Sequence, residues 1–233
     1  SILIGALAGL LLVGCGGSSS SKNDDMDPPP PPPPTVTYAY EITVTNLTYA
    51  QPMSPVAVIL HNEGQFWQIG QSASNALEVM AESGDNSGLL EESIAIASQS
   101  GAGILAPGMS ETISVSIEDT QPMMLSLATM LVNTNDAFTG INAMTLTNLT
   151  VGESISLRAG SYDAGTEKNS ELMSSIPGPA GGGEGYNEER DDVDFVAMHP
   201  GVVSSDDGLS TSALTQAHRF DNPSLSISIT RTE

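Results

Sequence analysis

Several segments of the chain alternate apolar and polar side chains, with serine and threonine filling most of the polar positions. The pattern is clearest at residues 40–45, 113–117 and 225–229. A period of two predicts strands with one buried and one solvated face. Residues 54–61 and 123–132 are more uniformly apolar and predict more fully buried strands. With hardly any helical sequence between the strands, the pattern favours an antiparallel β-sandwich over a parallel α/β sheet.

One segment has a helical period instead. Between residues 73 and 81, small and apolar side chains recur three and four residues apart, and Gly84 follows as a stop signal. A second, weaker helix is predicted at residues 89–98. The first helix has no basic polar face, so we expect it to pack on the core rather than on a membrane. The spaced residues are Ala73, Ala76, Leu77, Met80 and Ala81.

The N-terminal fifteen residues predict a secretory signal. An apolar run from Ile2 to Val13 is too short to cross a bilayer, which needs about 20 apolar residues. The sequence Leu-Val-Gly-Cys that ends at Cys15 resembles a bacterial lipobox, in which the cysteine becomes the lipidated first residue. Residues 1–15 are therefore interpreted as an N-terminally truncated lipoprotein signal peptide; the alternative is a buried strand with an incidental thiol.

A spacer follows the predicted anchor. Residues 16–35 contain a polar Gly/Ser-rich part and the seven prolines Pro28–Pro34, which predict a stiff polyproline II rod. We interpret it as a stalk that carries a domain at 36–233, although such a rod can also be a ligand for an aromatic groove. Export through the Sec pathway and a lipid-anchored place in the cell envelope are expected. Gly16, where an inner-membrane lipoprotein commonly has Asp, favours the outer membrane or cell surface.

The net charge argues against nucleic acid as a partner. The common catalytic motifs are also missing from the sequence. With 28 acidic and 6 basic residues the net charge is −22, which repels nucleic acid but suits divalent cations. The three histidines form no HExxH motif, the only cysteine is assigned to the anchor, and no GxSxG elbow occurs. We therefore expect no enzymatic activity. His199, which ends an apolar run, is the histidine with the best claim to a role.

Acidic residues provide the candidate cation ligands. Asp163 and Glu167 lie four positions apart in SYDAGTEKNSE, and Ala164-Gly165 between them allow a tight turn. Calcium binds six to eight oxygens from carboxylates, carbonyls and water, so the two acids can converge on one ion. The alternative is a pair of solvated loop acids. A second run, Asp191, Asp192 and Asp194, lacks the EF-hand pattern and is interpreted as a solvated loop within the Gly-rich and acidic stretch 177–194.

Together, these segments resemble the spondin family in its bacterial form. The resemblance rests on YEITVTNLTYAQPMSPVAVILHNEGQFWQIGQSASNALEVMAESGD, then MLVNTNDAFTGINAMTL, then SYDAGTEKNSE, and it extends over roughly Tyr38 to Arg231. It implies an antiparallel β-sandwich related to C2 domains, with one calcium held by Asp136, Asp163 and Glu167. The chain departs from the family where Ala137 replaces a tryptophan, where Glu167 replaces an aspartate, and where the cysteines of the animal proteins are missing.

The resemblance also bears on function, because the animal members are matrix proteins of adhesion and recognition. The leading hypothesis is a non-enzymatic surface lipoprotein that binds calcium and an extracellular protein or glycan. One alternative is an envelope polysaccharide hydrolase that uses carboxylates of the 184–194 loop. Another is a structural envelope component without a discrete ligand.

Overall fold

The computed structural model describes residues 32–221 and 223–233. Cys15, the signal sequence and most of the spacer lie outside the described residues, so the interpretation of that segment stays a prediction. Residues Thr35–Glu233 form one compact unit. Within the described part, no helix is both long and apolar enough for a membrane crossing.

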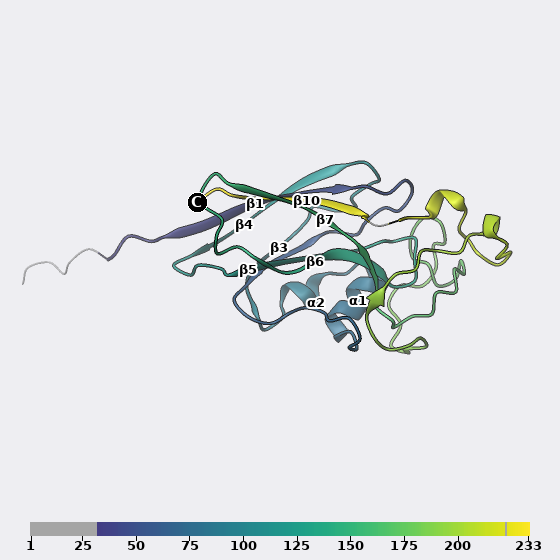
Figure 1. Cartoon of the computed structure of the whole chain (residues 1–233). Coiled ribbons are helices and arrows are strands. Elements are labelled where there is room, and N and C mark those ends of the chain that lie inside the picture. Colours follow the sequence, from purple (N-terminus) through teal and green to yellow (C-terminus); the bar gives the residue numbers. More distant parts are fainter. Residues whose placement is uncertain (1–31, 222) are drawn as a thin grey trace, which may run out of the picture. The chain divides into compact units, whose positions relative to one another are not determined.

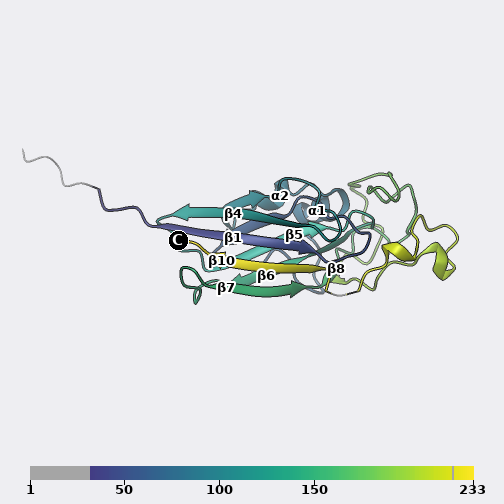
Figure 2. The same ribbon diagram turned by 90° about the horizontal axis from the view of Figure 1, so that it is seen from above.

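The unit is built from two antiparallel sheets that face one another (Figures 1 and 2). The four-stranded sheet has the order β4 (Ser110–Glu118), β1 (Thr37–Asn46), β10 (Leu225–Arg231) and β7 (Ser154–Ala159). The six-stranded sheet has the order β3 (Ala95–Ser100), β2 (Ala57–His61), β5 (Met124–Met130), β6 (Ala137–Thr145), β8 (Ser161–Asp163) and β9 (Ala197–Met198). This arrangement confirms the predicted β-sandwich.

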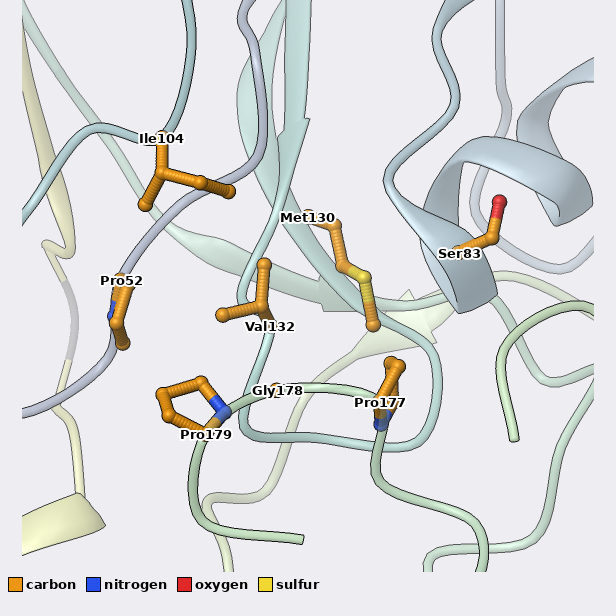
Figure 3. A pocket seen from close by; sticks show the side chains of 8 residues that line it. All are labelled: Pro52, Ser83, Ile104, Met130, Val132, Pro177, Gly178 and Pro179. Carbon is orange, nitrogen blue, oxygen red and sulfur yellow. The ribbon is translucent and has the colours of Figure 1, made fainter. Parts of the chain in front are cut away.

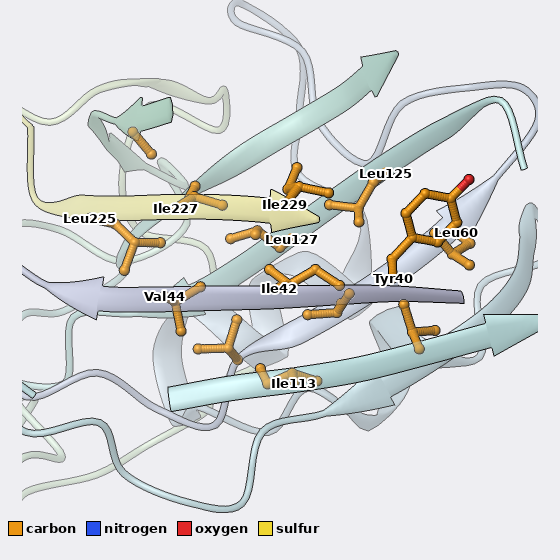
Figure 4. Packing of buried hydrophobic residues seen from close by; sticks show 14 of the residues in the cluster. Tyr40, Ile42, Val44, Leu60, Ile113, Leu125, Leu127, Leu225, Ile227 and Ile229 are labelled. Carbon is orange, nitrogen blue, oxygen red and sulfur yellow. The ribbon is translucent and has the colours of Figure 1, made fainter. Parts of the chain in front are cut away.

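The main core lies between the two sheets, where the alternating segments meet. Tyr40, Ile42 and Val44 of β1 point inward and are at most 1% exposed. They pack with Leu127 from the opposite sheet and with Ile227 of β10 (Figure 4). On the outer face, hydroxyl side chains pair across the strands, as between Thr43 and Thr112, whose Oγ1 atoms lie 2.8 Å apart. The period of two thus decided which residues enter the core.

Two helices cover the other side of the six-stranded sheet. Helix α1 (Asn75–Ser83) is N-capped by Ser74, whose Oγ accepts from the Leu77 N–H at 3.2 Å. It ends at Gly84, which has φ of 78° and donates its N–H to the Met80 carbonyl. Its apolar face packs on β2, β5 and β6 in a second buried cluster. The prediction of a core-facing helix is confirmed, as is its stop at Gly84.

The second helix differs from the prediction. Helix α2 comprises only Ser87–Leu90. Of the segment predicted as helix, 89–98, residues 91–94 lie outside any helix or strand and residues 95–98 belong to β3. There, Ala95–Ser100 pairs antiparallel with β2 at the edge of the sheet. The helical expectation was therefore wrong: pairing with the buried strand β2 outweighed the weak local helical pattern.

At the end of the sandwich opposite the start of β1, long connections replace regular structure (Figure 1). The predicted loop at 177–194 contains no helix or strand. Two short 3-10 turns follow, η1 (Ser205–Asp207) and η2 (Gln216–His218). Connections at this end, together with the ends of β5, β6, β8 and α1, position the candidate site.

Candidate functional site

The register of β6 and β8 brings Asp136 and Asp163 together. Ala137 at the start of β6 pairs with Asp163 at the end of β8. Asp136 immediately precedes β6, and its carbonyl accepts the Ala164 N–H at 3.3 Å. A tight turn fixes this position, because the Ala137 N–H donates to Thr134 Oγ1 at 3.0 Å. Two acids far apart in the sequence therefore become neighbours.

The Asp136 carboxylate is fully buried, and only one of its two oxygens accepts hydrogen bonds. Its Oδ2 accepts the backbone N–H groups of Thr166 at 2.8 Å and Glu167 at 3.1 Å, and the Thr166 hydroxyl at 3.3 Å. Its Oδ1 is buried without a hydrogen-bond partner. Burial, and next the negative charge of Asp163, raise the pKa of Asp136 to about 8. A buried, partnerless carboxylate oxygen beside a second carboxylate is an environment that a cation would stabilise.

Asp163 is oriented by a chain of side-chain hydrogen bonds. Its Oδ1 accepts the Gly165 N–H at 2.8 Å, and its Oδ2 accepts the Asn169 amide at 2.5 Å. The Gly201 N–H donates to Nδ1 of His199 at 2.9 Å, so the ring proton is on Nε2 and is donated to Asn169 Oδ1 at 3.2 Å. Burial lowers the pKa of His199, which favours this neutral ring. His199 and Asn169 together hold the Asp163 carboxylate in place.

The backbone and the side chain of Glu167 contact different groups. Whereas its N–H donates to Asp136, its carboxylate lies near Glu82 at the end of α1. Burial raises the pKa of Glu167 to about 7, and the charges of Glu82, Asp191 and Glu184 add to this rise, while the Asn135 side chain opposes it. Among the described residues, no three Asp, Glu, His or Cys side chains gather as a metal site. The structure therefore brings Asp136 and Asp163 together and places the Glu167 carboxylate beside other acids.

The acidic loop lies over this turn. The Asp194 N–H donates to the Gly165 carbonyl at 2.7 Å, and the Asp191 N–H donates to the Thr166 carbonyl at 3.1 Å. Arg190 ties the loop to α1, since it contacts both carboxylate oxygens of buried Glu78, at 2.9 and 2.7 Å. The turn that carries the candidate ligands is thus enclosed between the sheet and a clamped loop.

Residues 47–177 match the Spondin_N family over more than half of the chain. The chain belongs to the Spondin_N family. The matched segment contains Asp136, Asp163 and Glu167, and it ends before the loop that carries Arg190 and before His199, which follows β9. A search of the curated proteins finds no match. Membership of the spondin family, which the sequence motifs predicted, is confirmed.

Aromatic side chains pack next to Ala137, the position at which the resemblance implied a tryptophan. Phe138 stacks on Tyr162 with ring centroids 5.2 Å apart, and Trp67 meets the Phe138 ring edge-on, also at 5.2 Å. Ala137 itself is fully buried. The start of β6, next to Asp136, is therefore packed with an alanine at position 137.

Sequence reasoning missed three polar residues of this Spondin_N site: Glu82, Asn135 and Asn169. Glu82 had a usable signal, because a carboxylate in the last turn of a helix opposes the helix dipole and needs a compensating reason. Asn169 lies within the quoted SYDAGTEKNSE segment but carries no charge. Asn135 directly precedes Asp136, and its contact with Glu167 depends on the fold.

The remaining predicted candidates lie elsewhere. His61 is buried, with ring nitrogens 2.9 Å from the Glu63 carbonyl and from Ser126 Oγ, which is a structural arrangement. Glu188 and Glu189, among the carboxylates available to the hydrolase alternative, are exposed on the loop. An apolar pocket of about 370 Å³ opens nearby (Figure 3). No acid lines it; its walls are Pro52, Ser83, Ile104, Met130, Val132, Pro177, Gly178 and Pro179.

Proposed function

We propose that this Spondin_N domain is a calcium-binding recognition module without enzymatic activity, presented at the cell surface by a lipid anchor at Cys15. The observation that carries the calcium part is the buried, partnerless Oδ1 of Asp136 beside Asp163. The lipid anchor and the envelope location rest on the sequence around Cys15.

Asp136 and Asp163 fit a hard cation that prefers oxygen ligands. Asp136 Oδ2 is fixed by the turn, which leaves Oδ1 for the ion, and each oxygen of Asp163 has a second lone pair beyond its one hydrogen bond. Bound calcium would supply the positive charge that these two carboxylates lack. Backbone carbonyls and water would complete the ligand set, as is usual for calcium.

A bound ion would make one end of the sandwich rigid, and this matters for recognition. The turn at 163–169 is bonded to the loop at 184–196, so an ion that fixes the turn also fixes the loop. Loops held by a rigid scaffold are where binding residues are commonly placed. An extracellular protein or glycan is the partner that such a surface would meet outside the cell.

The experiment is a thermal melt of the full chain in calcium and in chelator. We expect calcium to raise the melting temperature, because the ion binds the folded protein and not the unfolded chain. Asp163→Asn should lose most of that rise, whereas Asp221→Asn, at an exposed aspartate, should keep it. Identical melting curves of the unaltered protein in calcium and in chelator would refute the calcium part of the proposal.

A further inference from the structure

Three segments bring a second group of carboxylates together, next to the Asp136–Asp163 pair but distinct from it. Glu82 comes from the last turn of α1, and Glu167 from the turn after β8. Glu184 and Asp191 come from the loop that Arg190 clamps. The negative charges of Glu82, Glu184 and Asp191 each raise the pKa of Glu167.

Two oxygens of this group are buried without partners. Glu82 is only 1% exposed; its Oε2 accepts the Asn187 N–H at 2.9 Å, and its Oε1 accepts nothing. Glu167 Oε2 is likewise buried and partnerless. Burial is the main reason that the pKa of each carboxyl is raised. A buried carboxylate oxygen normally has a donor or a cation, so both oxygens need an explanation.

Among the described residues, no basic side chain forms an ion pair with either carboxylate; the charge of Arg190 makes only the smallest contribution to the pKa of Glu82, in the lowering direction. The ion pairs in this part of the chain are made by Arg190 and Arg219 alone, and neither pairs with Glu82 or Glu167. Arg190, the nearer one, is already bound to Glu78, Asp194 and the Ala73 carbonyl. The negative charge of the pair is therefore compensated either by a bound proton or by a cation from solution.

We propose that Glu82 and Glu167 bind a second calcium ion, separate from the one at Asp136 and Asp163. Calcium suits this position better than magnesium, because two carboxylates from different segments fit a flexible oxygen shell completed by water. The Thr166 hydroxyl donates to Asp136 Oδ2 at 3.3 Å, and the Thr166 side chain also lowers the pKa of Glu82, so Thr166 lies near both positions. The inference does not depend on the first ion, since the two carboxylate pairs share no residue.

The length of the Glu167 side chain explains how its carboxylate comes near Glu82. The extra methylene relative to aspartate lets the carboxylate extend beyond Asp136, to which the Glu167 backbone is bonded, and approach α1. An aspartate at 167 has a shorter reach toward Glu82. The longer side chain thus connects the turn after β8 to the end of the helix.

The test counts calcium ions bound to the metal-free full chain by equilibrium dialysis and by isothermal titration. We expect two ions for the unaltered protein, one for Glu82→Gln and one for Asp163→Asn. Glu91→Gln, which removes the same charge from an exposed position, should still bind two. Glu167→Gln is a second variant in case Glu82→Gln does not fold, and it should also bind one.

The outcomes separate the two proposals. If both Glu82→Gln and Glu167→Gln keep two ions, or if the unaltered protein binds one ion that only Asp163→Asn removes, the inference is wrong. A proton shared between Glu82 and Glu167 would give this second result. If the unaltered protein binds one ion that Glu82→Gln removes and Asp163→Asn does not, the inference stands and the first site is refuted.

Discussion

At the scale of single residues, the buried Asp136 is one group that makes the stability of the calcium-free protein depend on pH. Its pKa is raised from 3.8 to about 8 in the folded state. Between about pH 4 and pH 8 the folded protein therefore holds a proton that the unfolded chain has lost, and stability falls as the pH rises through this range. We expect the melting temperature in chelator to decrease from about pH 5 to pH 8.

The control for this pH dependence is Asp136→Asn, which cannot ionise but can still accept the Thr166 and Glu167 N–H groups. Its melting temperature should decrease less over the same range. Glu82 and Glu167 also have raised pKa values, so part of the slope remains. Equal slopes for Asp136→Asn and the unaltered protein would contradict the assignment of the proton to Asp136.

Asn169 tests whether the orientation of Asp163 matters for the ion. Replacing it by alanine removes the amide that binds Asp163 Oδ2. Loss of a residue that orients a metal ligand typically lowers metal affinity about 10–100-fold, and we expect Asn169→Ala to weaken calcium binding by that factor. Asn148→Ala, at an exposed loop position, should leave the dissociation constant unchanged. A purely structural Asn169 would lower the melting temperature in chelator without affecting calcium affinity.

The sequence suggested which residues to consider, but it did not predict where each side chain points. Asp136 and Asp163 meet because the family motifs place them beside β6 and β8, which pair. The path of the Glu167 side chain depends on α1, whose position relative to the turn no local motif specifies. Asn169 and His199 act through hydrogen bonds between distant loops, so neither spacing nor charge reveals their role.

At the scale of elements, the turn after β8 depends on a close approach that only glycine permits. Gly165 has φ of 71°, and a Cβ there would lie 2.3 Å from the Phe195 carbonyl oxygen. Gly165→Ala adds this clash to the cost of the left-handed conformation, so we expect a loss of about 2–5 kcal/mol in the free energy of unfolding. Chemical denaturation in chelator measures it.

Gly182 provides the matched control for that substitution. Its φ is 70°, and a Cβ there would meet nothing within 4 Å. Gly182→Ala should therefore cost only the conformational part, about 1–2 kcal/mol. If both alanines cost the same, the loop does not press on the turn as closely as this geometry requires.

The segment 89–98 illustrates which elements a sequence specifies weakly. Small residues at Ala95 and Ala97 suit a helix as well as a strand, and the helix α2 ends at Leu90. Pairing of Ala95–Ser100 with the buried strand β2 decided the outcome. The short strands β8 and β9, of three and two residues, are too brief to show any period in the sequence.

At the scale of the whole molecule, alternation was sufficient to predict a sandwich but not its strand order. The four-stranded sheet places the N-terminal β1 beside the C-terminal β10, with β4 and β7 at the edges. Such long-range pairing follows from the shared core, which a local pattern does not encode. The segment that matches the Spondin_N family, 47–177, contains neither β1 nor β10.

This topology predicts that the matched segment does not fold by itself. Strands β1 and β10 contribute six core side chains that are each at most 1% exposed. Burying six such side chains stabilises the fold by roughly 9–18 kcal/mol, comparable with the entire stability of a domain, about 5–15 kcal/mol. A fragment of residues 47–177 should therefore show no cooperative thermal transition, whereas residues 35–233 should melt cooperatively. A cooperative melt with native-like near-ultraviolet circular dichroism for the short fragment would contradict the essential role of the two terminal strands.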